Sequence, residues 1–280
     1  METVRPRHTG FCFGVRDALA LTAEALDHSD EAVALGQVVH NSKALLELEA
    51  RGLRQVPELP RENRIPVVIT AHGATPGLLR EAAARKLEVV DTTCPLVRRV
   101  QRHAEELHQQ RLPVVIVGHA THQEVVGVAG WAGGDSGAEV EIVSTVSEAD
   151  ALPYRERRGV VCQSTFPQPV FREIANHIAA RTGSLEVRDT TCPVVNQRQR
   201  EALSDMLARV DVVIVVGGRG SANTVALAET CSSHRPTHHV ESAAELRPEW
   251  FEKGHRIGIT SGTSTPGWVV DEVEEACRAL

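Results

Sequence analysis

The sequence predicts an α/β protein of three similar small units, each with its own parallel sheet, arranged as a pseudo-threefold ring around a central site. The first observation is a pentapeptide that occurs twice, because Asp-Thr-Thr-Cys-Pro fills both 91–95 and 189–193. The second is Cys12, in Gly-Phe-Cys-Phe-Gly-Val, which has a valine three residues later, as do Cys94 and Cys192. A helical pattern follows each cysteine. Internal repeats of this kind outweigh local propensity in assigning a fold.

Residues that were not used to find the repeat extend it. A strand-like apolar run begins about twenty residues after each cysteine, at 32–35, 114–117 and 212–215. A later run in each unit ends in small polar residues and a proline, at 72–76, 163–167 and 262–266. Only 3% of the residues are aromatic, against 42% hydrophobic. The cores must therefore consist of Val, Leu, Ile and Ala, as in parallel strands covered by helices on both faces.

We place the three repeats at 13–93, 94–191 and 192–280. Each repeat is barely large enough for its own core, so the units should pack against one another. Right-handed crossovers keep the strand before Cys94 in the first sheet and the strand before Cys192 in the second. The third unit has no later strand of that kind. We therefore expect residues 1–12 to supply its missing strand and so close the ring.

The elements of the first repeat follow in order. Apolar residues three or four positions apart predict a helix, and its buried face comprises Val15, Leu19, Ala23 and Leu26. A strand up to Val39 leads to a helix that begins at 40–43 and is ended by Gly52. The segment 56–66 is polar and rich in proline, which predicts a loop. A buried strand over 66–70, a helix to Lys86 and the strand before Cys94 complete the unit.

The second repeat has the same order, and the third departs from it most. In the third, a helix over 196–209 leads through a strand to a glycine-rich loop at 217–223 and a further helix. The stretch 232–240 is polar, so we interpret it as irregular and its histidines as surface residues. An apolar stripe that ends in Cys277 predicts the terminal helix.

Composition limits the functions that the chain can have. Of its 280 residues, 37 are acidic and 30 are Lys or Arg, a net charge of −7 that offers little to nucleic acid. No apolar run is long enough for a membrane span, and the amino terminus lacks a signal peptide's apolar core. We therefore expect a cytoplasmic protein that binds neither membrane nor nucleic acid. We also expect a monomer, although composition does not determine the oligomeric state. Outside a secretory context, its six cysteines argue against disulfides, and we interpret Cys162, Cys231 and Cys277 as buried apolar side chains.

Cys12, Cys94 and Cys192 are candidate metal ligands, since each lies where a strand turns into a helix, the place where α/β sheets bind ligands. Helix amino termini favour the thiolate over the thiol. Three converging thiolates repel one another unless a cation neutralises them. Three protein ligands leave a position open, which is typical of a catalytic site. Zinc and a [4Fe–4S] cluster with one iron not ligated by cysteine both fit, and three buried cysteines without metal are the alternative.

Other strand ends contribute imidazoles, hydroxyls and an amide, which are donors that a phosphate or diphosphate needs. Singly, a histidine of this kind is more often a structural residue. Glu124 lies two residues beyond one of these histidines, where a surface ion pair is its alternative role. The candidate lining residues are His40, His72, His122, Ser164, Thr165, Ser221, Asn223 and Ser264.

An ordered set of segments resembles one known family, the 4-hydroxy-3-methylbut-2-enyl diphosphate reductases (IspH/LytB family), and covers nearly the whole chain. The segments are Gly-Phe-Cys-Phe-Gly-Val at 10–15, Val-His-Asn at 39–41, Ala-His-Gly at 71–73, the pentapeptide at 91–95, Gly-His-Ala-Thr-His-Gln-Glu at 118–124, Gln-Ser-Thr at 163–165, the second pentapeptide with 196–199, Ser-Ala-Asn at 221–223 and Gly-Thr-Ser-Thr-Pro at 262–266.

The resemblance implies the last step of the non-mevalonate isoprenoid pathway, in which a central iron–sulfur site removes a hydroxyl group and yields isopentenyl and dimethylallyl diphosphate. It implies a [4Fe–4S] cluster on Cys12, Cys94 and Cys192, whose open iron takes the substrate hydroxyl. Glu124 would supply protons, and Ser164 or Thr165 would assist near the hydroxyl. The diphosphate would be bound by His40, His72, His122, Ser221, Asn223 and Ser264.

A ferredoxin or flavodoxin would supply the electrons. Arg98, Arg99 and Arg102 form a basic cluster that could receive such an acidic carrier, although a solvated helix face is the alternative. Two departures from the family pattern put substrate affinity in question. Ala222 stands where many members have a second serine, and the segment 189–193 has a proline after its cysteine and no apolar residue before it.

Rival functions stay open at the level of the sequence. A three-cysteine zinc hydrolase acting on a phosphorylated substrate is one, and an iron–sulfur carrier or redox sensor is another. A carrier usually ligates every iron, whereas here only three cysteines lie on the repeat. A paralogue acting on another phosphorylated substrate is the third. The product ratio and the identity of the electron donor cannot be derived from these residues.

Overall fold

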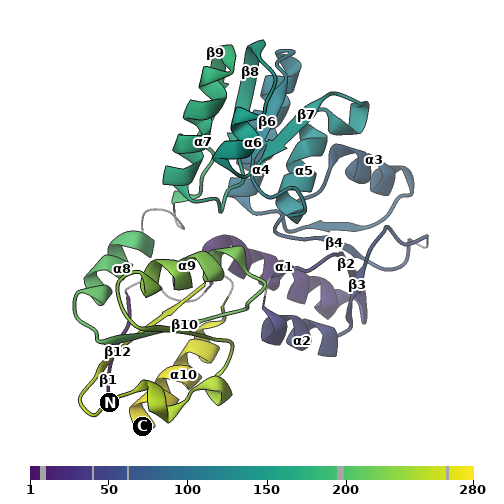
Figure 1. The fold of residues 1–280 in the computed structure, drawn as a ribbon. Helices are drawn as coiled ribbons and strands as arrows, with labels where there is room; N and C mark the ends of the chain where they lie inside the picture. The colour runs from purple at the N-terminus through teal and green to yellow at the C-terminus, as the bar shows by residue number, and fades with distance from the viewer. Residues whose placement is uncertain (7–10, 40, 62, 194–198, 263–264) are drawn as a thin grey trace. The chain divides into compact units, whose positions relative to one another are not determined.

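The computed structural model describes residues 1–6, 11–39, 41–61, 63–193, 199–262 and 265–280. Within these ranges the chain forms three four-stranded sheets whose strand pairings are all parallel, with helices in the connections (Figure 1). The predicted α/β class with three small parallel sheets is confirmed. None of the described helices has the length and apolar character needed to cross a membrane.

The chain divides into two compact units. Residues 17–38 and 48–192 form the two-sheet unit, and residues 1–16, 39–47 and 193–280 form the one-sheet unit. The repeat boundaries given above and the ring arrangement stay predictions.

The first sheet has the strand order β3-β2-β4-β5. Its inner strands, β2 (Ala32–Leu35) and β4 (Val67–Ile69), consist of aliphatic side chains that are almost all buried. The outer strands, β3 (Leu53–Val56) and β5 (Val89–Asp91), are more exposed. The helices of this stretch are α1 (Phe13–His28), α2 (Ser42–Ala50) and α3 (Pro76–Ala84).

The second sheet has the order β7-β6-β8-β9, with β6 (Val114–Val117) and β8 (Arg155–Cys162) in the centre. Successive side chains of a strand point to opposite faces. Val115 and Val117 accordingly pack with α7 on one face, and Ile116 packs with α4 and α5 on the other. The other elements are β7 (Val140–Val143), β9 (Thr182–Val187), α4 (Pro95–Gln109), α5 (Gln123–Trp131), α6 (Val146–Asp150), α7 (Gln168–Ala180) and a 3-10 turn, η1 (Gly134–Ser136).

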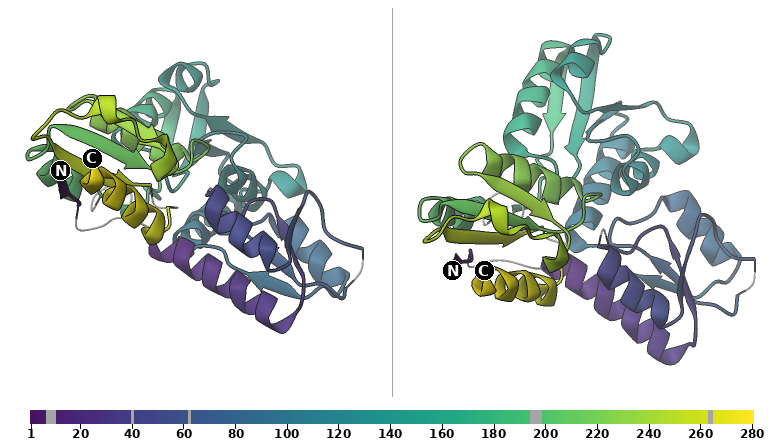
Figure 2. Two further views of the ribbon diagram at one scale, coloured as in Figure 1. Left: turned by 90° about the horizontal axis from the view of Figure 1, so that it is seen from below. Right: turned by 60° about the horizontal axis from the view of Figure 1, so that its bottom comes forward.

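The third sheet has the order β1-β12-β10-β11, so its first strand comes from the amino terminus. Strand β1 (Glu2–Val4) pairs in parallel with β12, with Thr3 opposite Ile257. The prediction that residues before Cys12 complete the third sheet is confirmed. Both termini lie side by side (Figure 2), and the Met1 amino group donates to the Arg278 carbonyl at 3.1 Å. The other elements are α8 (Gln199–Leu207), β10 (Val212–Val216), α9 (Ala222–Ser232), β11 (Thr237–Val240), η3 (Ala243–Glu245), η4 (Pro248–Trp250), β12 (Arg256–Ser261) and α10 (Gly267–Ala279).

Deleting residues 1–8 is expected to destabilise the protein, because β1 is part of a sheet. Arg5 forms ion pairs with Asp271 at 2.7 Å and Glu274 at 2.6 Å, and the Thr3 hydroxyl donates to Glu274 at 2.7 Å. Losing a strand and these contacts should lower the unfolding midpoint by about 5 °C or more, on the scale of about 2–4 °C per kcal/mol. Thermal unfolding followed by circular dichroism measures the change. An unchanged midpoint would show that β1 adds nothing to stability.

Strand β2 ends at Leu35, four residues before the expected Val39. Gly36 has a φ of +90°, and a Cβ at this position would lie 1.8 Å from the Gln123 side-chain nitrogen. The turn therefore favours glycine for its backbone angle, and a larger residue would also displace the end of the Gln123 side chain. The chain leaves the sheet at this glycine.

The edge strands β3, β7 and β11 were not predicted. The interpretation of 232–240 as irregular is wrong for Ser232, the last residue of α9, and for Thr237–Val240, whereas 233–236 are irregular and His234 is exposed, as expected. Strand β11 occupies Thr237–Val240, and its residue His238 stacks on Trp250 with ring centroids 4.0 Å apart. Edge strands expose one side to water and carry polar residues, so their composition resembles that of loops. His238 and His239 are half-buried on this strand, not surface residues of a loop.

The buried face of α1 also differs from the prediction. Val15, Leu19 and Ala23 are only half-buried. The Thr22 hydroxyl donates to the Ala18 carbonyl at 2.7 Å, so a polar residue is satisfied within the helix and can be buried. The buried positions of α1 are Gly14, Ala18, Thr22, Ala25 and Leu26.

Candidate active site

The two pentapeptides form the same hydrogen-bonded loop in the two-sheet unit. The Asp91 carboxylate accepts from the amide and the hydroxyl of Thr93, at 2.9 and 2.5 Å. The Asp189 carboxylate accepts from the amide and the hydroxyl of Thr191, at 3.1 and 2.5 Å. An aspartate that bonds the backbone two residues ahead fixes a turn locally. This turn sets the backbone of the cysteine that follows it.

The remaining threonine of each pentapeptide ties the loop to the neighbouring strand. The Thr92 hydroxyl donates to the Ile69 carbonyl at 2.7 Å, and the Thr190 hydroxyl donates to the Cys162 carbonyl at 2.6 Å. The two cysteine amides also donate across the sheet, from Cys94 to Ala71 at 3.0 Å and from Cys192 to Ser164 at 2.7 Å. The Asp-Thr-Thr sequence is therefore the scaffold that presents Cys94 and Cys192 alike.

Cys12 lies in the one-sheet unit and has the same relation to its helix. The Cys12 carbonyl accepts from the Arg16 amide at 3.0 Å, immediately before α1, as the Cys94 carbonyl accepts from Arg98 at 2.9 Å before α4. Cys12 and Cys94 are half-buried and Cys192 is buried. All six cysteines lie within the described ranges, and none of them is in a disulfide.

The other three cysteines are fully buried, as expected for apolar side chains. Burial raises the pKa of Cys231 to about 12 and that of Cys277 to about 11. The pKa of Cys162 is also raised well above its usual value, by burial first and then by the charges of Glu124 and Asp189. These thiols stay protonated at neutral pH and are poor metal ligands.

The donor set suits a soft metal or an iron–sulfur cluster. Cys12 and Cys94 each stand at the start of a helix, where the backbone dipole stabilises a thiolate, and the residues that follow Pro193 lie outside the described ranges. They are divided between the two compact units, and no three potential ligands converge on one point within the residues that the structure describes. The zinc and iron–sulfur alternatives both require thiolate ligands, and these three side chains provide them.

Glu124 is buried at the carboxyl edge of the second sheet, with 1% of its surface exposed. It lies in the first turn of α5, and its two carboxylate oxygens accept from Ser164, one from the amide at 2.6 Å and one from the hydroxyl at 2.9 Å. Burial raises the pKa of Glu124 to about 7, although the two bonds from Ser164 lower it in part. The surface ion pair considered as its alternative role is therefore wrong. This carboxyl group can exchange a proton at neutral pH.

Ser164 connects this carboxyl group to a cysteine loop. Its amide and hydroxyl bind Glu124, and its carbonyl accepts from the Cys192 amide. All three residues are at least nine-tenths buried. The predicted proton donor and a predicted metal ligand are thus held by the same residue.

His122 caps the amino terminus of α5. Its Nδ1 atom accepts from the Glu124 amide at 3.2 Å, so in the neutral ring the proton is on Nε2, which is then a donor. The His72 ring meets the His122 ring edge to face, with centroids 5.3 Å apart. The structure therefore brings together two of the predicted lining histidines.

Thr165 follows Ser164 and is half-buried. Its hydroxyl oxygen accepts from the Gln163 side-chain amide at 3.0 Å, and the Gln163 side-chain oxygen accepts from the His119 amide at 3.0 Å. Because the hydroxyl accepts from Gln163, its own hydrogen can point to another acceptor. Gln163 was not recognised from the sequence as a positioning residue.

Two further candidates lie at one helix start in the one-sheet unit. Ser221 caps α9, with its hydroxyl oxygen accepting from the Thr224 amide at 3.4 Å, and Asn223 is half-buried in the first turn. Backbone amides at a helix start attract anions such as phosphate. The other two candidates, His40 and Ser264, lie outside the described residues.

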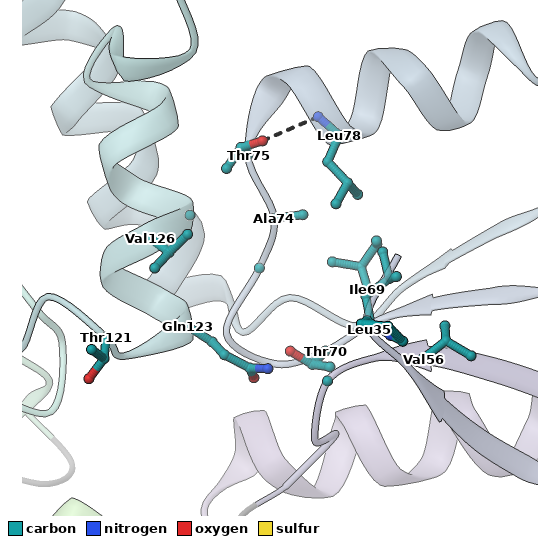
Figure 3. Close-up of a pocket in the computed structure, with 14 residues that line it drawn as sticks. Leu35, Val56, Ile69, Thr70, Ala74, Thr75, Leu78, Thr121, Gln123 and Val126 are labelled. Carbon is teal, nitrogen blue, oxygen red and sulfur yellow. Dashed lines mark hydrogen bonds between the residues drawn. The ribbon is translucent and has the colours of Figure 1, made fainter. Parts of the chain in front are cut away.

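A separate cavity of about 280 Å³ lies in the two-sheet unit (Figure 3). Its lining comes from β2, β3, β4 and the starts of α3 and α5. It is largely apolar, with Leu35, Ile69 and Val126 among the side chains labelled. The lining contains neither Glu124 nor a cysteine, and neither His72 nor His122. The cavity does reach Gly73 and Gln123, which are chain neighbours of these site residues.

Comparison with known proteins identifies relatives along the whole chain. The model of the family described as LytB protein matches residues 4–278. The chain is 39% identical over 277 residues to the 4-hydroxy-3-methylbut-2-enyl diphosphate reductase of Geobacter sulfurreducens, covering 98% of this chain and 96% of that protein. It is 37% identical over 281 residues to the reductase of the same name from Geotalea uraniireducens, covering 100% and 98%.

Solved structures give the same result. A structure of (E)-4-hydroxy-3-methyl-but-2-enyl diphosphate reductase, the terminal enzyme of the non-mevalonate pathway, matches with a TM-score of 0.75 and 31% identity over 100% of both chains. The E-1-hydroxy-2-methyl-but-2-enyl-4-diphosphate reductase of Plasmodium falciparum matches with a TM-score of 0.87, covering 98% of this chain and 87% of that one, and at 23% identity it supports the fold alone. Since the family match and the relatives span nearly the whole sequence, this chain belongs to the LytB family.

Proposed function

We propose that this protein is a 4-hydroxy-3-methylbut-2-enyl diphosphate reductase, which removes the hydroxyl group of that substrate and yields isopentenyl and dimethylallyl diphosphate. The observation that carries the proposal is the buried junction in which Ser164 holds the Glu124 carboxylate and the Cys192 amide. Expelling a hydroxyl group as water needs both protons and electrons. The junction places a group that titrates near neutral pH beside a cysteine loop.

Cys12, Cys94 and Cys192 would hold a [4Fe–4S] cluster with one iron not ligated by cysteine. When bound, this cluster supplies the two electrons of the reaction. A ferredoxin or flavodoxin would resupply these electrons. Glu124 holds a proton for the leaving hydroxyl group, and Ser164 keeps the carboxyl group in place. The Thr165 hydroxyl, fixed by Gln163, is a donor for the same end of the substrate.

The diphosphate would be bound by imidazole, hydroxyl and amide donors. In the two-sheet unit these are the Nε2 atom of His122 and the neighbouring His72. In the one-sheet unit they are Ser221 and Asn223 at the start of α9, where backbone amides add to the binding of an anion. His40 and Ser264 complete the proposed set.

The test uses protein purified without oxygen. Iron, zinc and acid-labile sulfide are measured first, and the candidate diphosphate is then added with a reduced viologen dye. We expect iron with sulfide, dye oxidation, and alkenyl diphosphates of five carbons. Zinc without sulfide would favour the hydrolase, and an intact cluster without turnover would favour a carrier, a sensor or a paralogue with another substrate.

The rate should fall as the pH rises through about 7. Burial raises the pKa of Glu124 to about 7, so the carboxyl group is protonated below this pH and loses its proton above it. A general acid works only in its protonated form, so kcat should drop about tenfold per pH unit well above the pKa. The measurement is kcat at saturating substrate from about pH 6 to about pH 9. A flat profile over this range would mean that Glu124 does not limit the rate.

A further inference from the structure

Helix α4 carries three arginines whose contacts differ. Arg98 forms an ion pair with Asp91 at 2.8 Å, and its Nε donates to the Thr93 carbonyl at 3.4 Å. Arg99 donates from Nη2 to the Thr191 carbonyl at 3.2 Å. Among the described residues, Arg102 forms an ion pair only with Glu106 on its own helix, at 3.7 Å, and 63% of its side chain is exposed.

The two carbonyl groups that Arg98 and Arg99 bind have equivalent positions. Thr93 comes directly before Cys94, and Thr191 comes directly before Cys192. Consecutive residues of one helix therefore bind the two pentapeptide loops, although the second loop is 92 residues away from Arg99. The cluster of arginines is not simply a solvated helix face, because two of its members contact the backbone beside a candidate metal ligand.

The charges of the three arginines are balanced differently. Asp91 neutralises Arg98, and Glu106 and water neutralise Arg102. Arg99 is half-buried and forms no ion pair with any described residue, and its Nε atom is buried without a hydrogen-bond partner. A cation withdrawn from water without an anion is unfavourable. Thiolates carrying a metal cluster next to Thr191 would supply the negative charge that Arg99 lacks.

We propose that Arg99 is a positioning residue that joins the Cys192 loop to α4 and places an unneutralised positive charge beside the cluster thiolates. This inference rests on the proposed function only in requiring that the three cysteines hold an iron–sulfur cluster. Reduction adds negative charge to the cluster, and a nearby cation stabilises the reduced form more than the oxidised form. Arg99 therefore raises the reduction potential of the cluster.

The experiment compares Arg99→Met, Arg99→Lys and Arg102→Met as loaded proteins. A redox titration followed by electron paramagnetic resonance gives the midpoint potential of each. Arg99→Met should make reduction about tenfold less favourable, a potential more negative by about 59 mV for one electron. Arg99→Lys keeps the charge and should stay close to the unaltered protein. Arg102→Met, which removes an equally charged but solvent-neutralised arginine of the same helix, should not change the potential.

A wild-type potential in Arg99→Met, with iron and sulfide contents intact, would overturn the inference. An equal shift in Arg99→Lys and Arg99→Met would overturn the role of the charge, because lysine retains it. If Arg99→Met cannot be loaded, the titration of Arg99→Gln replaces it, with the same expected shift. Thermal unfolding of each variant separates these results from general destabilisation. Absence of a cluster in the unaltered protein would instead contradict the proposed function.

Discussion

Replacing Cys12, Cys94 or Cys192 by serine is expected to remove most of the bound iron and sulfide and nearly all turnover. A hydroxyl oxygen is a hard ligand and a poor substitute for a thiolate on iron. In two of the variants the loop itself should survive, because its geometry depends on Asp91, Asp189 and the threonine hydroxyls, not on sulfur. Iron and sulfide analysis, the visible absorption of the cluster and the viologen assay measure the effect.

The remaining cysteines provide matched controls. Serine at Cys162, Cys231 or Cys277 should leave cluster content and turnover per folded molecule unchanged. These fully buried thiols do not occupy the position that Cys12, Cys94 and Cys192 share in the three repeats. Burying a hydroxyl group in their place costs about 1–3 kcal/mol, so a lower unfolding midpoint is expected. Full iron loading in Cys94→Ser would assign the cluster to other residues. Loss of the cluster in Cys231→Ser, with the cluster retained in the other variants, would also assign the cluster to other residues.

The cysteine loops could be predicted from the sequence because the features that shape them are local. An aspartate followed by two threonines fixes a turn through bonds that span two residues, so identical sequences at Cys94 and Cys192 give identical loops. The buried central strands could be predicted for a similar reason, since runs of Val and Ile such as 212–216 have few alternatives.

The edge strands β3, β7 and β11 could not be predicted in the same way. In β3 the exposed residues Arg54 and Gln55 lie between two apolar residues, a pattern that also occurs in loops. Whether such a segment becomes a strand or a loop depends on pairing with a buried neighbouring strand. This pairing joins residues far apart in sequence. The buried face of α1 was misplaced because Thr22 satisfies its hydroxyl within the helix.

The candidate site depends both on local features, which the sequence predicts, and on contacts between residues far apart in the sequence, which it does not. The sequence indicated Glu124 through its distance of two residues from His122, a local relation that the helix cap explains. It could not show that Ser164, 40 residues away, would bind both carboxylate oxygens. It also could not show that Arg99 would contact the second cysteine loop, because no spacing rule connects a helix residue to a carbonyl group 92 positions later.

Glu124→Gln is expected to lower kcat by on the order of 10²-fold or more and to change the KM for the diphosphate little. Glutamine has the shape of glutamate, and its side-chain oxygen can still accept from the Ser164 amide, so the junction with Cys192 should persist. The titrating proton and the negative charge are removed, and the second oxygen, which accepts from the Ser164 hydroxyl, becomes an NH2 group that can donate to the Ser164 oxygen instead. The assay is viologen-driven turnover on protein whose iron and sulfide contents match the unaltered enzyme.

Two further measurements make this result specific to the proton. The fall in rate near pH 7 should disappear from the residual activity, because burial raises the Glu124 pKa to about 7 and glutamine does not titrate. Glu148→Gln is the matched control, since Glu148 lies in the same unit but its bonds to Ser144 lower its pKa, so it stays ionised at neutral pH. Its removal should leave the rate and the pH profile unchanged. Near-normal turnover in Glu124→Gln would mean that the protons reach the substrate by another route, because glutamine has no proton that it can give at these pH values.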